Sequence, residues 1–141
     1  MRGKQWILPG SLFCLIAAAG LAGWIPAAQS GREKIERGRY LVHRVAKCIE
    51  CHTPRTAEGD LDETRLLQGA PIPLRSPFPN RPWAFQAPTI AGLPGWSEED
   101  VIYLLQNGVR PGGRRPLPPM PRFGMTREDA EAVVAYLKSL R

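Results

Sequence analysis

Proline concentrates in two stretches of this chain, and no other feature restricts the fold as strongly. Seven prolines fall within residues 69–95 and five within residues 111–121. Proline has no backbone N–H and a fixed φ angle, so it interrupts both helices and sheets. Long segments of this kind in a small domain are normally functional or disordered. Apolar residues in or just after the first stretch argue against disorder: Trp83, Phe85, Ile90, Leu93 and Trp96. We therefore expect two ordered loops that wrap around a group which supplements the core.

The chain begins with a long uncharged segment. Arg2 and Lys4 precede residues 6–28, which contain no charged side chain. A positive start followed by an apolar run is typical of an export signal, and about 20 helical residues suffice to cross a bilayer. We predict that residues 1–29 form an uncleaved anchor, with the rest on the periplasmic side of the bacterial inner membrane. The alternatives are removal as a signal peptide, which leaves a soluble periplasmic protein, and lipidation at Cys14.

Residues 30–141 are expected to form a single all-α domain. The apolar periodicity and the capping signals predict four helices, at about residues 32–46, 61–68, 97–107 and from 126 onward. Two of these begin with a strong N-cap, because Ser97 is followed by Asp100 and Thr126 by Asp129. No alternating pattern of apolar and polar residues predicts a strand.

The chemistry is carried by the sequence Cys48-Ile49-Glu50-Cys51-His52. This C-x-x-C-H pattern is the attachment motif of c-type haem. Two thiols at this spacing can add across the two vinyl groups of one haem, and the adjacent histidine can then supply a nitrogen ligand to the iron. A thioredoxin-like dithiol would need a preceding strand, which the sequence does not offer. A zinc site with His43 as the fourth ligand would have poor spacing.

The sixth iron ligand is expected from a methionine further along the chain. No histidine follows His52, and the candidates are Met120 and Met125. Met120 lies between prolines in a stiff segment that could hold its thioether rigidly, so it is the favoured candidate. Met125 directly precedes the cap Thr126, where a side chain often packs against its own helix. An open sixth position is the remaining alternative. His43 is interpreted as a surface or packing residue.

From about Arg37 to its end, the chain resembles a class I monohaem c-type cytochrome, and in particular the cytochrome domains and subunits of bacterial dehydrogenases and oxidases. The motifs that carry the resemblance are Gly38-Arg39-Tyr40-Leu41, the C-x-x-C-H segment with Thr53, Ala87-Pro88-Thr89-Ile90-Ala91-Gly92, Gly95-Trp96-Ser97, Pro119-Met120-Pro121 and Ala135-Tyr136-Leu137-Lys138-Ser139-Leu140. The resemblance implies a class I cytochrome c fold, with three to four helices and long loops around one covalent haem.

The resemblance also implies a role for each residue of the site. Cys48 and Cys51 would form the thioether bonds, His52 would be the proximal iron ligand and Met120 the distal one. The first and last helices would cross where a small residue, Gly38, meets an aromatic one, Tyr136. The sequence departs from the family in a proline-rich insert at residues 71–82, to which we assign no role, and in Arg122 directly after Met120-Pro121.

A histidine–methionine pair leaves no open position on the iron, which favours one-electron transfer over catalysis. The expected function is therefore that of a free electron carrier, or of an electron-transfer subunit in a respiratory or dehydrogenase complex. A haem-based sensor or a catalytic haem protein with an open sixth site is the alternative. The candidates for an apolar shell around the haem are Trp83, Phe85, Ile90, Leu93, Trp96 and Phe123.

The formal net charge of +6 is unevenly distributed. Between Val101 and Arg127 the only charged residues are arginines: Arg110, Arg114, Arg115, Arg122 and Arg127. Four of them flank Met120, and we expect them to dock an acidic redox partner. The alternative is that one or two neutralise the haem propionates while the others are solvated. Nucleic-acid binding is not expected, because the basic residues do not follow an element that could read a groove.

Overall fold

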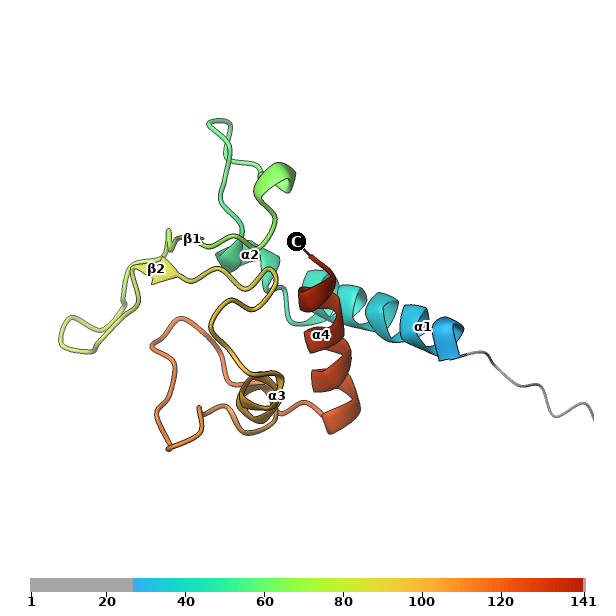
Figure 1. Cartoon of the computed structure of the whole chain (residues 1–141). Helices are drawn as coiled ribbons and strands as arrows, with labels where there is room; N and C mark the ends of the chain where they lie inside the picture. Colours follow the sequence, from blue (N-terminus) through green and yellow to red (C-terminus); the bar gives the residue numbers. More distant parts are fainter. Residues whose placement is uncertain (1–26, 141) are drawn as a thin grey trace, which may run out of the picture.

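The computed structural model describes residues 27–140 and shows a mainly helical domain, as predicted (Figure 1). Its framework consists of three helices, which are α1 (Ala27–Tyr40), α3 (Glu98–Asn107) and α4 (Arg127–Ser139). The shorter elements are a π-helical turn η1 (Leu41–Val45), a single turn α2 (Ile49–His52), a 3₁₀ turn η2 (Glu63–Arg65) and the strands β1 (Ala70–Pro71) and β2 (Gln86–Ala87). Long loops join these elements and form much of one side of the molecule.

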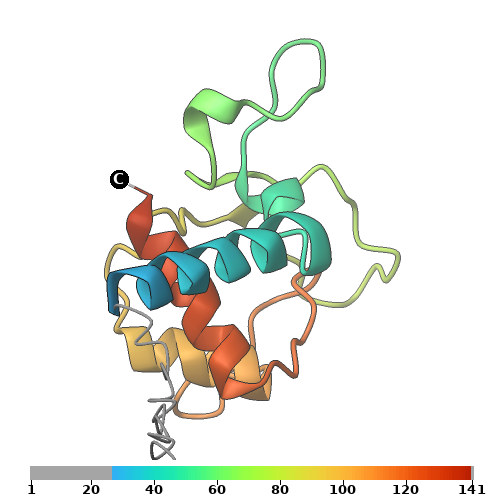
Figure 2. The same ribbon diagram turned by 90° about the vertical axis from the view of Figure 1, so that its right-hand side faces the viewer.

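Helices α1 and α4 cross at a close contact, which Figure 2 shows face on. A Cβ atom built on Gly38 would lie 1.9 Å from the carbonyl oxygen of Ala132 and 2.7 Å from the Cβ of Tyr136. Only glycine can occupy this position without moving one of the helices. The predicted meeting of Gly38 and Tyr136 is therefore confirmed. The ion pairs Lys34–Glu131 (2.8 Å) and Arg37–Asp129 (2.9 Å) flank the same interface.

The core lies between the three framework helices, where the apolar face of each one is buried. The residues buried on α3 are Val101, Ile102, Leu104 and Leu105, and those on α4 include Ala130, Val133, Val134 and Leu137. Both predicted caps are present. The Ser97 hydroxyl accepts from the backbone N–H of Asp100 at 3.1 Å, and the Thr126 hydroxyl accepts from that of Asp129 at 3.2 Å.

The predicted helix at residues 61–68 is wrong, since only the 3₁₀ turn η2 forms there. The Asp62 side chain caps the turn by accepting from the backbone N–H of Thr64 at 3.0 Å. Leu67 then turns inward with a φ of 58° and is fully buried. A helix cannot continue through a left-handed residue, so a tertiary contact of Leu67 replaces the expected regular structure.

Two smaller differences concern regular elements. The first helix begins at Ala27 rather than near residue 32, and it is followed by the π-helical turn η1, where Val45 is exposed. Strands were not expected, but β1 and β2 pair antiparallel, with Ala70 opposite Ala87. Strands of two residues are too short to leave an alternating sequence pattern.

The anchor predicted at residues 1–29 lies outside the described residues, apart from the first three residues of α1. Within residues 27–140, no helix combines the length and the apolar character that crossing a membrane would need.

Candidate functional site

The C-x-x-C-H segment forms a tight helical turn directly after η1. The backbone N–H of Cys48 donates to the carbonyl of Val42 at 2.9 Å, and that of His52 donates to the carbonyl of Cys48 at 2.9 Å. Cys48 and Cys51, three residues apart, lie on one face of this turn. Both are free and partly buried. Two thiols that share a face are placed to react with one planar group.

Burial raises the pKa of the Cys48 thiol to about 11. Redox-active dithiols work in the opposite way, because they lower the pKa of the attacking cysteine to generate a thiolate near neutral pH. The environment of Cys48 therefore disfavours the dithiol alternative.

His52 is buried, and its ring is oriented by a residue far away in the sequence. Its Nδ1 lies 2.7 Å from the carbonyl oxygen of Pro88, so Nδ1 carries the hydrogen and donates it. Burial lowers the pKa of His52, which keeps the imidazole neutral. The lone pair of the other ring nitrogen, Nε2, is thus available to a metal, in the arrangement that is usual for histidine ligands.

The loop that carries Pro88 is held against His52 by backbone hydrogen bonds. The N–H of Gly69 donates to the carbonyl of His52 at 2.7 Å, just before β1 pairs with β2. Gly69 has a φ of 85°, and a Cβ atom there would lie 2.8 Å from the backbone nitrogen of Thr89. The first proline-rich loop is therefore ordered where it meets the histidine.

Further hydrogen bonds connect the same loop, through Leu67, to Thr53, the residue that follows His52. The Thr53 hydroxyl accepts from the backbone N–H of Leu67 at 3.0 Å, and the carbonyl of Leu67 accepts from those of Ile90 (2.9 Å) and Ala91 (3.1 Å). Thr53, Leu67 and Pro88 have no role that could be predicted from the sequence. Their contacts are made largely by backbone groups, for which the side-chain pattern gives no signal.

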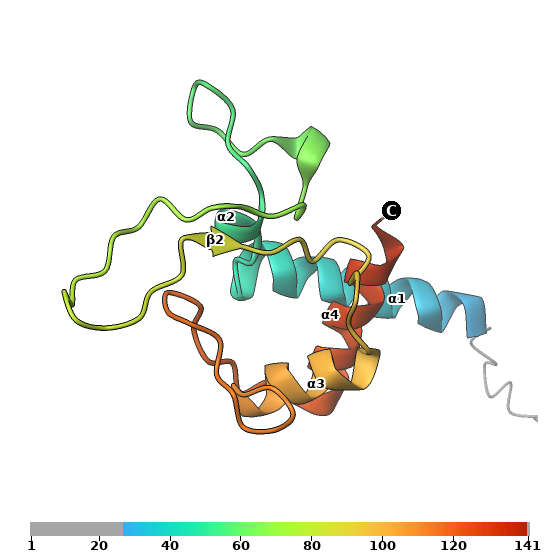
Figure 3. The same ribbon diagram turned by 60° about the vertical axis from the view of Figure 1, so that its left-hand side comes forward.

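The segment that carries Met120 is tied to the first proline-rich loop. The N–H of Ala84 donates to the carbonyl of Pro118 at 2.8 Å. In Figure 3 this segment rises from α3 toward β2 and α2, the elements next to the histidine. Met120 is half-buried and lies outside the apolar core cluster, whereas Met125 packs against that cluster. The structure thus gives Met125 a packing role and leaves the Met120 thioether without one.

Arg110 holds a buried polar atom that lacks a partner. Its guanidinium carbon lies 4.6 Å from the centre of the Trp96 ring, and its Nε is buried without a hydrogen-bond partner among the described residues. Leaving such a donor unsatisfied costs about 1–3 kcal/mol, more for a charged group. An anionic group at this point would remove that cost, and a haem carries two carboxylates. These residues therefore fit a haem.

Paired and unpaired charges lie in different regions of the domain. Every ion pair between described residues lies within residues 34–65, or among α1, α3 and α4 and their caps. Residues 64–97 and 101–127 contain no acidic residue. The arginines in the two proline-rich loops or directly next to them are outside every one of these ion pairs: Arg75, Arg81, Arg110, Arg114, Arg115 and Arg122. We call these six residues the loop arginines. Arg122 also packs its side chain over Gly108, where a Cβ atom would lie 2.9 Å from its own.

The predicted apolar shell divides into two groups. Leu93 is buried in the core, and Ile90, Trp96 and Phe123 pack against it. Trp83 and Phe85 instead line a groove in the insert, and the Phe85 side chain is 85% exposed. The structure does not bring all six residues together.

His43 makes a structural contact, in agreement with its interpretation as a packing residue. Its Nε2 lies 2.6 Å from the hydroxyl of Tyr136 on α4. Burial lowers the pKa of His43, as do the charges of Arg39 and Arg44, so the neutral ring can accept the phenol hydrogen. Within the described part of the chain, no group of three His, Cys, Asp or Glu residues could hold a metal ion.

The sequence of this chain is similar to those of several known proteins. The family model for cytochrome c matches residues 35–141. Among curated proteins, a dihaem cytochrome c-type protein of Cereibacter sphaeroides is 37% identical over 126 residues, which cover 85% of this chain and 40% of that protein. The cytochrome subunit of fructose dehydrogenase from Gluconobacter japonicus is 31% identical over 114 residues, covering 74% and 21%.

A third relative is the cytochrome c subunit of the quinone alcohol dehydrogenase from Gluconobacter oxydans. It is 29% identical over 139 residues, covering 84% of this chain and 28% of the subunit. The chain therefore spans less than half the length of the curated relatives it matches.

Proposed function

Because this chain belongs to the cytochrome c family, which carries covalently attached haem c, we propose that it transfers single electrons through one haem with histidine and methionine ligands. Cys48 and Cys51 would hold the haem, and His52 and Met120 would ligate its iron. When bound, the haem supplies the reversible one-electron couple between ferric and ferrous iron. The observation that carries the proposal is the buried His52, oriented by Pro88 and directly preceded by two free thiols on one turn.

The chain's own residues have distinct tasks in this proposal. The hydrogen bond from His52 Nδ1 to Pro88 fixes the imidazole and makes Nε2 a stronger donor. The thioether of Met120 favours the ferrous state and so raises the reduction potential. Arg110 would give its unsatisfied Nε–H to a haem carboxylate. Together the two ligands would close the iron to substrates, which suits a carrier rather than an enzyme.

The relatives suggest where the electrons go. Two are named as cytochrome subunits of dehydrogenases, so we propose that this chain accepts electrons in the same kind of complex or carries them onward from one. Three of the loop arginines (Arg114, Arg115 and Arg122) flank Met120 in the sequence and would face an acidic redox partner, whereas Arg110 would serve the haem carboxylate. We further propose that residues 1–29 anchor the domain of residues 30–141 on the periplasmic side of the membrane, with signal-peptide cleavage as the alternative.

The ligand pair is tested by the spectrum of the oxidised holoprotein. A methionine–iron(III) bond gives a weak charge-transfer band in the far red. We expect this band in the wild type, its loss in Met120→Ala, and its retention in the matched variant Met125→Leu. The reduction potential should fall in Met120→Ala alone. A band that survives in Met120→Ala would contradict the assignment, and a high-spin, five-coordinate wild type would favour the sensor or catalytic alternative.

A further inference from the structure

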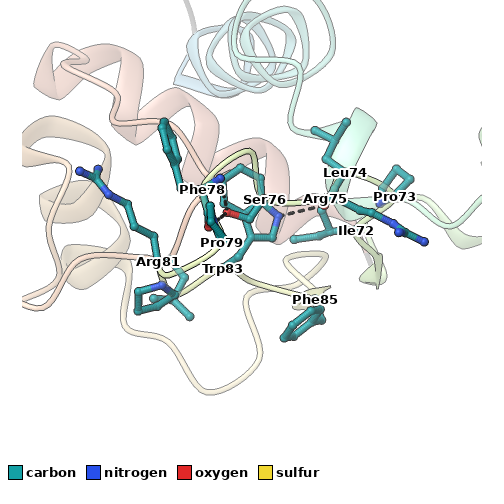
Figure 4. A pocket seen from close by; sticks show the side chains of 12 residues that line it. Ile72, Pro73, Leu74, Arg75, Ser76, Phe78, Pro79, Arg81, Trp83 and Phe85 are labelled. Atoms are coloured by element: carbon teal, nitrogen blue, oxygen red, sulfur yellow. Dashed lines mark hydrogen bonds between the residues drawn. The ribbon is translucent and has the colours of Figure 1, made fainter.

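The proline-rich insert, to which the sequence assigned no role, forms a groove of about 670 Å³ (Figure 4). Its walls come from residues 72–85 together with Leu117 of the Met120 segment. Two internal hydrogen bonds order the insert. The indole N–H of Trp83 donates to the carbonyl of Leu74 at 2.9 Å, and the Ser76 hydroxyl donates to that of Phe78 at 2.7 Å. With these polar groups satisfied, the surface offered by the groove is mainly apolar.

Large apolar side chains around the groove are exposed to solvent. Leu74, Phe78 and Leu117 are each about half exposed, and Phe85 is almost fully exposed. Isolated exposed apolar residues are common, but a cluster of them around a depression usually marks an interaction site. The insert therefore has the properties of a surface that another molecule covers.

The charge of the groove indicates what kind of molecule that is. Arg75 and Arg81 both line it, and the Arg81 guanidinium carbon lies 5.0 Å from the centre of the Phe78 ring. Neither arginine is in an ion pair of the described structure, and residues 64–97 contain no carboxylate that could serve as a partner. The groove thus complements a surface on which an apolar side chain is flanked by carboxylates.

The groove also adjoins the proposed redox centre. Leu117 forms part of its wall, three residues before Met120, and the hydrogen bond from Ala84 to the Pro118 carbonyl joins the insert to that segment. A protein seated in the groove would therefore contact the segment that carries the proposed distal ligand. Electron transfer needs such closeness and needs no further chemistry from the groove.

We infer that this groove is the docking site for an acidic redox partner protein, which inserts an apolar side chain between Phe78 and Phe85 and pairs its carboxylates with Arg75 and Arg81. One electron passes between the partner and the iron, with no proton or bond exchanged. The inference rests on the proposed electron-transfer function.

The test measures electron transfer from the ferrous holoprotein to two acceptors. One is an acidic blue-copper protein with an apolar surface over its oxidised copper, and the other is hexacyanoferrate(III), a small anion that needs no groove. In the double variant Leu74→Ser/Phe78→Ser we expect the second-order rate with the copper protein to fall about fivefold or more. The rate with hexacyanoferrate(III) and the haem spectrum should stay unchanged. Tyr103→Ser is the matched control, because Tyr103 is a similarly exposed aromatic residue on α3, outside the groove.

The charge part of the inference is tested by ionic strength. In Arg75→Gln/Arg81→Gln the rate with the copper protein should lose much of its dependence on salt. The control Arg32→Gln/Arg44→Gln removes the same charge from α1 and η1 and should keep that dependence.

Several outcomes would overturn the inference. Equal rates for wild type and groove variants would do so. So would an altered haem spectrum in Leu74→Ser/Phe78→Ser, because the groove would then be a wall of the haem site. A wild-type dimer that dissociates in the same variant would assign the groove to a second copy of the chain. Failure of the ferrous wild type to give electrons to hexacyanoferrate(III) would instead contradict the proposed function itself.

Discussion

The helical framework of α1, α3 and α4 differs from the two proline-rich loops in two respects. One is whether apolar side chains are buried, and the other is whether charged side chains are paired. In the framework, apolar residues are buried together and the charges on the surface are largely paired, as in Lys34–Glu131 and Arg37–Asp129. In the loops, arginines lie outside every ion pair of the described structure and Phe78 and Phe85 are exposed. The framework is thus complete by itself, whereas the loops are shaped for contacts with other molecules.

The largest effect on stability is expected from a substitution of Gly38, at the closest contact between α1 and α4. In Gly38→Ala the new methyl group would overlap the Ala132 carbonyl, so α1 and α4 must separate. We expect a loss of about 3 kcal/mol in the free energy of unfolding, typical of severe overpacking. Denaturant unfolding of the ferric holoprotein measures this effect.

Gly31→Ala on the same helix is the control for that substitution, since a Cβ atom there meets nothing within 4 Å. It should stabilise the protein by about 0.5–1 kcal/mol, because alanine favours a helix more than glycine does. If both substitutions changed the free energy of unfolding equally, the crossing of α1 and α4 would have room for a methyl group. That result would contradict the tight packing of the framework.

A smaller effect is expected from His43, which lies in η1 and contacts Tyr136 of the framework helix α4. Because the pKa of His43 is lowered in the folded protein, the unfolded chain takes up a proton first as the pH falls below about 6.5. The contribution of His43 to stability is therefore complete above that pH and is lost as the pH falls through the folded pKa. In His43→Gln the stability should depend less on pH between about 6.5 and 5. Denaturation midpoints of both proteins across this range give the comparison, and parallel curves would contradict it.

The smallest effect compares a paired arginine with an unpaired one. Arg37→Gln removes hydrogen bonds of 2.9 and 3.2 Å to Asp129 and should lower the denaturation midpoint slightly, less so at high salt. Arg114→Gln removes a loop arginine and should leave the midpoint unchanged or raise it, since like charges no longer repel each other. A clear loss of stability in Arg114→Gln would mean that the loops also depend on their charges for folding.

The sequence predicted features whose physical cause is local. The caps at Ser97 and Thr126 depend on a side chain that reaches a backbone N–H three residues away, so their pattern is visible along the chain. The helix predicted at residues 61–68 does not form, because a contact distant in the sequence determines the conformation there. Its local pattern was overruled by the hydrogen bond between Leu67 and Thr53, fourteen residues apart.

The same division applies to the site. The sequence by itself determined the attachment motif at Cys48, Cys51 and His52, the candidate methionines and the excess of arginine in the loops. Only the tertiary structure decided that His52 is oriented by Pro88, that Met125 belongs to the core and that the insert forms an arginine-lined groove. The physical reason is that a motif depends on neighbours along the chain. Burial, backbone hydrogen bonds and unpaired charge depend on residues that only the fold brings together.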